Sequence, residues 1–194
     1  STAFVFYGKE IGPNQNQFYY SMKSGNGFTS PSSVTGALAA FDRVMCYRPE
    51  AMAKYYDRSA PASNDSGADV YHPDSGKLLK DEGDALLLGQ FEKFSQIHVS
   101  LSTAGSGGAV TWHYWDGSNW KNFEPVSGEY NFDSTPSRIR LWQDACDMPS
   151  DLQSSVVAGH SKFWIKIVVS SDFAAAPVGS QITSAEDLPF VTSL

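Results

Sequence analysis

Histidine is the side chain of this sequence best suited to acid–base or metal chemistry, and its four copies are scattered. His72, His98, His113 and His160 lie far apart along the chain. A protein metal site usually shows ligands at short fixed spacing, as in His-Glu-x-x-His or Cys-x-x-Cys, and neither pattern occurs. We therefore interpret each histidine as a surface or strand-face residue, and we expect neither a metal ion nor a cofactor.

Carboxylates form two short clusters. Asp81, Glu82 and Asp84 make up one, and Asp144 with Asp147 makes up the other. Such oxygen ligands suit calcium, but neither cluster has EF-hand spacing, so carboxylates that cap turns are the simpler interpretation. Nothing selects the opposed carboxylate pair of a glycosidase, and no phosphate-binding loop or Gly-x-Ser-x-Gly elbow occurs. We predict that the protein is not an enzyme and has no catalytic residues.

An aromatic run at 110–123 is the most distinctive stretch of the sequence. Its Asp-Gly pair at 116–117 tolerates the positive φ of a tight turn, so a β-hairpin is predicted. Alternation places Trp112 and Tyr114 on one face, where we predict core residues. For Trp115 and Trp120 two interpretations stay open: core residues, or an exposed platform on which sugar rings stack.

These aromatic residues need strands to position them, and apolar–polar alternation predicts strands throughout the chain. In 163–169 the odd-numbered residues are apolar, with Trp164, Lys166 and Val168 on the other face. Strands are predicted at 3–7, 17–22, 41–47, 94–101, 109–115, 120–123, 129–132, 138–142 and 163–169. Short strands separated by Gly, Pro, Asn and Ser indicate an all-β protein, built as an antiparallel sandwich or barrel.

Departures from the strand pattern are few. One or two short helices are predicted, at 49–56 and 147–152. Residues 59–83 are rich in Ser, Asp, Asn, Gly and Pro and predict a long loop excursion, either an arm that reaches a neighbour or a surface loop. We expect a single sandwich domain over 1–194, with 1–12 as a candidate N-terminal arm.

Composition narrows the classes of partner. Lys plus Arg number 14 against 21 Asp plus Glu, a net charge of −7, which argues against nucleic acid. No apolar stretch is long enough to span a membrane and no signal-peptide pattern opens the sequence, so we expect no membrane partner. Cys46 and Cys146 leave open one disulfide or two buried thiols.

Several of these segments, taken in order, resemble a known module. They are Leu86-Leu87-Leu88-Gly89, the strand at 94–101, the Trp-x-Tyr-Trp-Asp-Gly-x-x-Trp hairpin at 112–120 and the Phe-Trp-Ile-Lys-Ile strand at 163–167. This order resembles a jelly-roll-like β-sandwich module of phage structural proteins, including baseplate components and capsid decoration proteins. The resemblance covers roughly residues 84–170, and it departs from the module at His113, where Glu is usual.

The resemblance implies a virion structural protein, made in the host cytoplasm. Our first hypothesis is a capsid decoration or cement protein, a homotrimer that binds the major capsid protein or another virion protein and stabilises the shell mechanically. The residues expected to make assembly contacts are Phe4, Phe6, Tyr7, Tyr71 and His72. The alternative is a tail or baseplate receptor-binding or carbohydrate-binding module, which would bind a glycan through Trp115, Trp120, Trp142 and Trp164.

Overall fold

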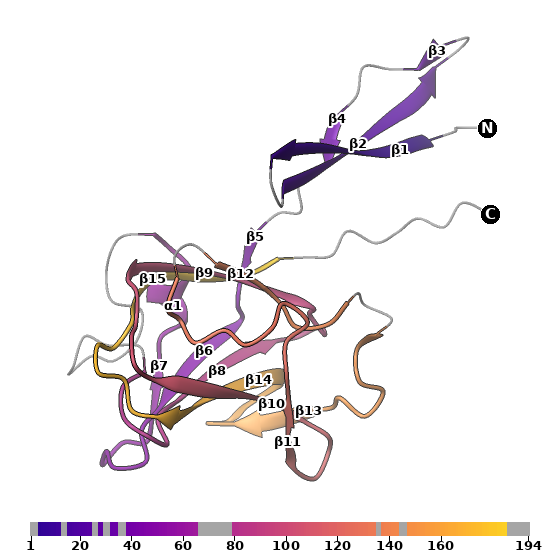
Figure 1. Cartoon of the computed structure of the whole chain (residues 1–194). Coiled ribbons are helices and arrows are strands. Elements are labelled where there is room, and N and C mark those ends of the chain that lie inside the picture. The colour runs from indigo at the N-terminus through magenta and orange to yellow at the C-terminus, as the bar shows by residue number, and fades with distance from the viewer. Residues whose placement is uncertain are drawn as a thin grey trace. The chain divides into compact units, whose positions relative to one another are not determined.

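The computed structural model describes residues 4–12, 15–24, 27–28, 32–34, 38–65, 79–134, 137–143 and 147–185. The chain divides into two compact units, Ser1–Ala37 and Leu38–Leu194 (Figure 1). We call them the N-terminal sheet and the sandwich. This division differs from the single domain predicted over 1–194.

The N-terminal sheet is built on a long hairpin. Strands β1 (Phe4–Gly12) and β2 (Gln15–Ser24) pair antiparallel, and β3 (Gly27–Phe28) and β4 (Ser32–Val34) both pair with β2. The strands predicted at 3–7 and 17–22 are therefore present in longer form. The segment 1–12, predicted as an arm, pairs along β2 through its described residues.

The sandwich consists of a large sheet of seven strands and a small sheet of four. The large sheet has the order β11–β10–β14–β8–β6–β7, with β13 also paired to β14, and the small sheet has the order β12–β9–β15–β5. The strands of the large sheet are β6 (Arg43–Tyr47), β7 (Tyr55–Asp57), β8 (Ala85–Gln90), β10 (Ala109–Trp115), β11 (Trp120–Phe123), β13 (Ser154–Val157) and β14 (His160–Ser171). Those of the small sheet are β5 (Leu38–Ala40), β9 (Gln96–Thr103), β12 (Ser137–Arg140) and β15 (Val178–Ala185).

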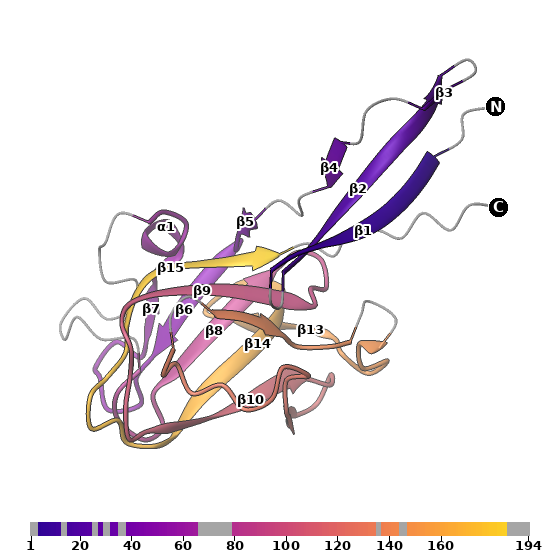
Figure 2. The same ribbon diagram turned by 45° about the horizontal axis from the view of Figure 1, so that its top comes forward.

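The chain crosses repeatedly from one sheet to the other. It changes sheet between β5 and β6, β8 and β9, β9 and β10, β11 and β12, β12 and β13, and β14 and β15. Figure 2 shows β9, β12 and β15 lying over β8, β10 and β14. All pairings are antiparallel, and frequent crossing between two such sheets is typical of jelly-roll-like sandwiches. The all-β sandwich predicted from the sequence is confirmed.

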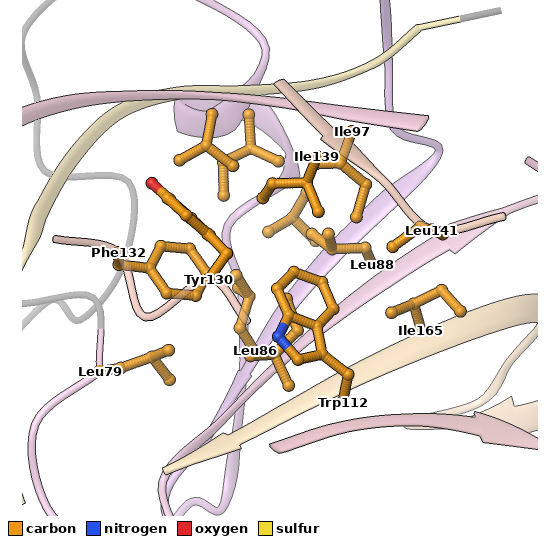
Figure 3. Close-up of a cluster of buried hydrophobic side chains, with 14 of the residues drawn as sticks. Leu79, Leu86, Leu88, Ile97, Trp112, Tyr130, Phe132, Ile139, Leu141 and Ile165 are labelled. Atoms are coloured by element: carbon orange, nitrogen blue, oxygen red, sulfur yellow. The ribbon is translucent and has the colours of Figure 1, made fainter. Parts of the chain in front are cut away.

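One hydrophobic core fills the space between the two sheets, because alternate residues of each strand point inward. Figure 3 shows Leu86, Leu88, Trp112 and Ile165 of the large sheet in this core with Ile97 and Ile139 of the small sheet. Each such side chain, fully buried, contributes about 1.5–3 kcal/mol to stability relative to exposure. Trp112 and Tyr114 are both buried, so the prediction that they are core residues is confirmed.

Two predicted elements differ in the structure. Residues 49–56 form a turn that leads into β7 instead of a helix, since Tyr55, Tyr56 and Asp57 pair with β6. No strand forms at 129–132, because Phe132 has a left-handed backbone, with φ 57°, which places its ring in the core. At 147–152 the single turn predicted from the sequence is present, and in it the Leu152 amide donates to the Pro149 carbonyl at 3.0 Å.

The predicted excursion at 59–83 begins with a short helix, α1 (Ser59–Ala62). Residues 66–78, with Tyr71 and His72, lie outside the described residues, and so does Cys146. Cys46 is buried on β6. In the described part of the chain, none of the helices has the length and apolar character needed to cross a membrane.

Candidate functional site

The outer face of the large sheet, which points away from the small sheet, carries a second hydrophobic cluster. Its buried members are Met45, Ala85, Leu87, Val157 and Trp164, and Tyr47, Trp120 and Val168 pack against them. The outward side of an antiparallel sandwich sheet is usually polar, with its apolar residues turned to the core. Here the central members are buried and form a second, smaller core, so only the half-buried residues packed against it, among them Trp120, are open to a ligand.

Trp164 is a structural member of the outer face. Its indole is completely buried, and its Nε1 donates to the Ser155 carbonyl at 3.0 Å. The ring lies over Gly89 on the neighbouring strand, where any Cβ would collide with it. Trp164 therefore cannot present a ring face to a ligand, and its predicted place in an exposed platform is wrong.

Trp142 is likewise part of the structure and not of a platform. It is 6% exposed, and its Nε1 donates to the Phe94 carbonyl at 3.2 Å. Its ring packs against Phe123, with centroids 4.4 Å apart, and edge-on against Tyr114 at 5.9 Å. These contacts place Trp142 in the main core, so the expected exposure of Trp142 is also wrong.

Trp115 and Trp120 remain on the outer face and are both half-buried. They are directly opposite each other on β10 and β11, with ring centroids 5.6 Å apart and planes inclined by 66°. Because the rings meet edge to face, they do not form the coplanar platform that the glycan-binding alternative predicts. They instead build an aromatic corner at one end of the sheet.

The tight turn between β10 and β11 holds this corner in place. The Asp116 carboxylate accepts hydrogen bonds from the Ser118 and Asn119 amides at 2.8 and 2.7 Å, and these bonds lower the pKa of Asp116. Lys121, on β11, pairs with Asp151, which also accepts a hydrogen bond from the Tyr114 hydroxyl at 3.1 Å. The position of Trp120 is therefore fixed by hydrogen bonds and ion pairs on both sides of the turn.

Lys166 of β14 reaches toward this aromatic corner. Its Nζ lies 5.4 Å from the centroid of the Trp120 ring, a cation–π distance. Burial lowers the pKa of Lys166. In the described part of the chain Lys166 has no carboxylate partner, whereas Lys80, Lys121 and Lys162 each pair with an aspartate. Lys166 is therefore a half-buried cation whose charge these residues leave uncompensated.

His113 lies beside Lys166, because the two residues are paired in the β10–β14 ladder. Its Nε2 is 2.9 Å from the Thr111 hydroxyl, and its Nδ1 is buried without a hydrogen-bond partner. Burial, and after it the charge of Lys166, lowers the pKa of His113, which favours a neutral imidazole. We refer to Trp115, Trp120, Lys166, His113 and Thr111 together as the Trp120–Lys166 site.

The other candidate groups from the sequence have structural roles. Asp84, which is 7% exposed, pairs with Arg48 at 3.4 Å, and Asp81 pairs with Arg48 and Lys80. These carboxylates are thus engaged with cations, and the described residues contain no cluster of three metal-ligating side chains. Asp147 is described but Asp144 is not, so that pair lies partly outside the described residues.

The remaining histidines are separate from one another. His160 contacts the Arg43 guanidinium at 3.4 Å on the large sheet. His98 lies on β9, between Arg138 of β12 and Thr183 of β15 in register. The Nδ1 of His98 and the hydroxyl of Thr183 are buried without a hydrogen-bond partner. The structure therefore brings no two of the described histidines into one site.

Together the fold and these sites define an all-β sandwich protein with an aromatic and cationic corner on its outer face. A comparison of the chain with protein-family models, curated proteins and solved structures finds no match. The argument for function therefore depends on the residues themselves.

Lys166 and His113 were not predicted from the sequence as partners in one site. Strand alternation did place Lys166 on the face opposite the core, together with Trp164. Alternation within one strand does not tell which strands are neighbours in the sheet. Only the pairing of β14 with β10 brings Lys166 next to His113 and Trp120.

Proposed function

We propose that this protein is a structural component of a virus particle, a decoration or cement protein that binds the outer surface of an assembled capsid. The resemblance of residues 84–170 to a module of phage structural proteins supports this proposal. In this role the sandwich is a rigid body, and the protein stabilises the shell by bridging neighbouring capsid subunits.

One observation carries the proposal: by register, one face of the N-terminal sheet gathers a group of apolar residues, with the polar Glu10, Asn16 and Ser32 beside them. On β1 and β2, Phe4 is opposite Met22 and Phe6 is opposite Tyr20, and Phe18 of β2 is opposite Val34 of β4. Successive strand residues alternate between faces, so all of these residues share one face. The other face carries a mixture of aromatic and polar positions.

A single sheet of this size does not supply its own second layer. Units below about 40 residues usually need disulfides, metals or association to be stable, and residues 1–37 contain neither Cys nor His. Sheets bury an apolar face against another layer of structure. The apolar face of the N-terminal sheet therefore favours burial against another protein subunit. We propose that this partner is the major capsid protein.

A closed homotrimer is the form we propose for the bound protein. A closed point group limits assembly to a defined number of copies. Many weak contacts repeated around a symmetric shell then add up through effective concentration, without any single tight contact. The resistance of the shell to rupture rises with the number of bridged subunits, and no chemical step is required.

The decisive experiment compares two pairs of substitutions on opposite faces of the same hairpin. Phe6→Ser with Tyr20→Ser alters the apolar face, and Tyr7→Ser with Tyr19→Ser alters the adjacent cross-strand pair on the other face. Each variant is mixed with capsids of the virus that encodes the chain, and the bound fraction is measured by co-sedimentation. We expect the first pair to abolish binding and the second to preserve it. Tyr7, expected from the sequence to make assembly contacts with Phe4 and Phe6, is on the opposite face by register and is therefore left out of the proposed contact surface.

Two further measurements test whether the variants remain folded and whether the protein is a trimer. Far-UV circular dichroism and thermal unfolding of the full chain should be the same in both variants, which shows that lost binding is not lost folding of the N-terminal sheet. Light scattering should give a mass near three times 21.1 kDa for the free protein. Equal binding by both variants, or no binding of the wild-type protein to capsids, would contradict the proposal.

A further inference from the structure

The Trp120–Lys166 site has the chemistry of an anion-binding site. Lys166 contributes a positive charge, and among the described residues no carboxylate pairs with it. A half-buried cation without a counter-ion costs free energy unless something else compensates it. Lys93 also lies over an aromatic ring without a carboxylate partner among the described residues, but it is exposed, so Lys166 is the one of the two that gains more from an external anion.

Hydrogen-bonding groups surround the charge. His113 is in register with Lys166 and keeps a buried Nδ1 that has no partner in the protein. The Thr111 hydroxyl, 2.9 Å from the other ring nitrogen of His113, continues the polar row along β10. Asn122 is paired with His113 on the edge strand β11 and is exposed. Asn122 and the half-buried Thr111 thus offer a ligand hydrogen-bonding groups beside the cation, whereas the buried Nδ1 of His113 does not face it.

Aromatic surface completes the site. The Trp115 and Trp120 rings are half-buried and meet edge to face, so they form two walls of a corner beside Lys166. The C–H faces of a sugar ring pack on indole surface, while its hydroxyl groups hydrogen-bond to neighbouring polar side chains. A simple inorganic anion would use the lysine but not these walls.

We propose that the Trp120–Lys166 site binds an acidic saccharide, whose carboxylate pairs with Lys166 and whose ring packs against Trp115 and Trp120. The inference concerns the sandwich alone. Because it uses no residue of the N-terminal sheet, it stands or falls separately from capsid binding. A protein on the outside of a particle would use such a site to attach to sugar-coated surfaces.

The test uses the full chain and the fluorescence of its tryptophans. The probes are sialyllactose and a glucuronate disaccharide, with lactose as the neutral control and acetate as the simple anion. We expect a saturable change with at least one acidic saccharide and none with lactose. A response to acetate equal to that of the acidic saccharides would overturn the saccharide assignment, and no response to either acidic saccharide would overturn the site.

Substitutions at Lys166 locate the binding. Lys166→Gln should weaken binding by about tenfold or more, as expected for loss of a charged hydrogen bond, while Lys166→Arg should retain most of it. Lys162→Gln is the matched control: it lies four residues earlier on the same face of β14, but its amine pairs with Asp42 at 3.0 Å. Unchanged binding in Lys166→Gln would contradict the proposal.

Thermal unfolding separates binding from a structural role. Lys166→Gln removes a half-buried charge, so the free variant should be at least as stable as the wild type while it binds the saccharide more weakly. If the variant loses both stability and binding, Lys166 stabilises the sheet and does not bind the saccharide directly. That result would contradict the proposal.

Discussion

Trp164 lies across Gly89 on the adjacent strand of the large sheet, so close that a Cβ on Gly89 would come within 2.5 Å of a ring carbon. Glycine inside a strand usually weakens it. Here its missing side chain makes the space in which the indole is buried, and the outer cluster forms around that ring. The second hydrophobic face of the sheet thus depends on one glycine.

Gly89→Ala should lower the free energy of unfolding by about 1–3 kcal/mol, the usual cost of overpacking. The new methyl group would have to displace a completely buried ring. Urea denaturation measures the effect. In a Trp164→Phe background the same substitution should cost clearly less, because the smaller ring leaves room, and equal costs in both backgrounds would contradict the contact.

Trp142→Ala should cost about 3–5 kcal/mol, as large-to-small substitutions of core aromatics do. The substitution removes a buried ring and leaves the Phe94 carbonyl without the indole donor. Trp115→Ala, at a half-buried position, should cost less than half as much. Similar costs in parallel denaturant titrations of the two variants would show that Trp115 is a core residue too.

Asp42 should make the protein sensitive to acid. Burial acts to raise the pKa of Asp42, but hydrogen bonds from Lys162 and the Phe91 amide outweigh it and leave the pKa below 3.8. The stabilising contribution is therefore complete above the unfolded pKa of about 3.9 and is lost as the pH falls through the lower folded value. Asp42→Asn should lower the melting temperature at pH 7, and the difference from wild type should shrink below pH 4. A difference that is constant with pH would exclude this role.

His98 should contribute a separate loss of stability at mildly acidic pH. Burial, and then the charge of Arg138, lowers the pKa of His98 in the folded protein. The unfolded chain takes up a proton near pH 6.5 while the folded chain does not, so stability falls as the pH drops below about 6.5 toward the folded pKa. His98→Gln should flatten the melting temperature between pH 7 and pH 5. An unchanged slope would show that His98 titrates normally.

Ala158→Asn should stabilise the hairpin between β13 and β14. Ala158 and Gly159 have φ of 48° and 85°, as a tight hairpin turn requires. A left-handed alanine costs about 1–2 kcal/mol, and asparagine tolerates this conformation better. We expect a gain of about 0.5–1 kcal/mol in denaturant titration, and a loss of stability would contradict the turn geometry.

Local patterns predicted the strands whose two faces differ in polarity. The alternation in 163–169 and the Asp-Gly turn at 116–117 were enough to place β14, β10 and β11 and to assign Trp112 to the core. Strand β15 escaped prediction because its buried residues include Ser180, Thr183 and Ser184, which are polar. Its Ser184 hydroxyl is satisfied by the Ala39 carbonyl at 3.1 Å, a contact that no local pattern reveals.

The candidate site was harder to predict because it also depends on contacts between residues that are far apart in the sequence. Trp164 faces away from the core, so alternation suggested exposure, and only the pairing with Gly89 explains its burial. Lys166 and His113 are more than fifty residues apart in sequence and meet because β14 pairs with β10. Which strands become neighbours is decided by the packing of the whole sandwich and not by any short segment.

The strand order has a consequence for synthesis on the ribosome. β14 lies between β8 and β10, and β5 finds its partner only in β15, with Ala39 and Ser184 separated by 145 residues. At roughly 5–20 residues per second, the ribosome needs about 7–30 s to synthesise the chain from Ala39 to Ser184. During that time β6, β8 and β9 emerge with their apolar sides uncovered, whereas β1 and β2 can pair as soon as they leave the exit tunnel. The nascent chain therefore depends on chaperones or on rapid completion far more for its sandwich than for its N-terminal hairpin.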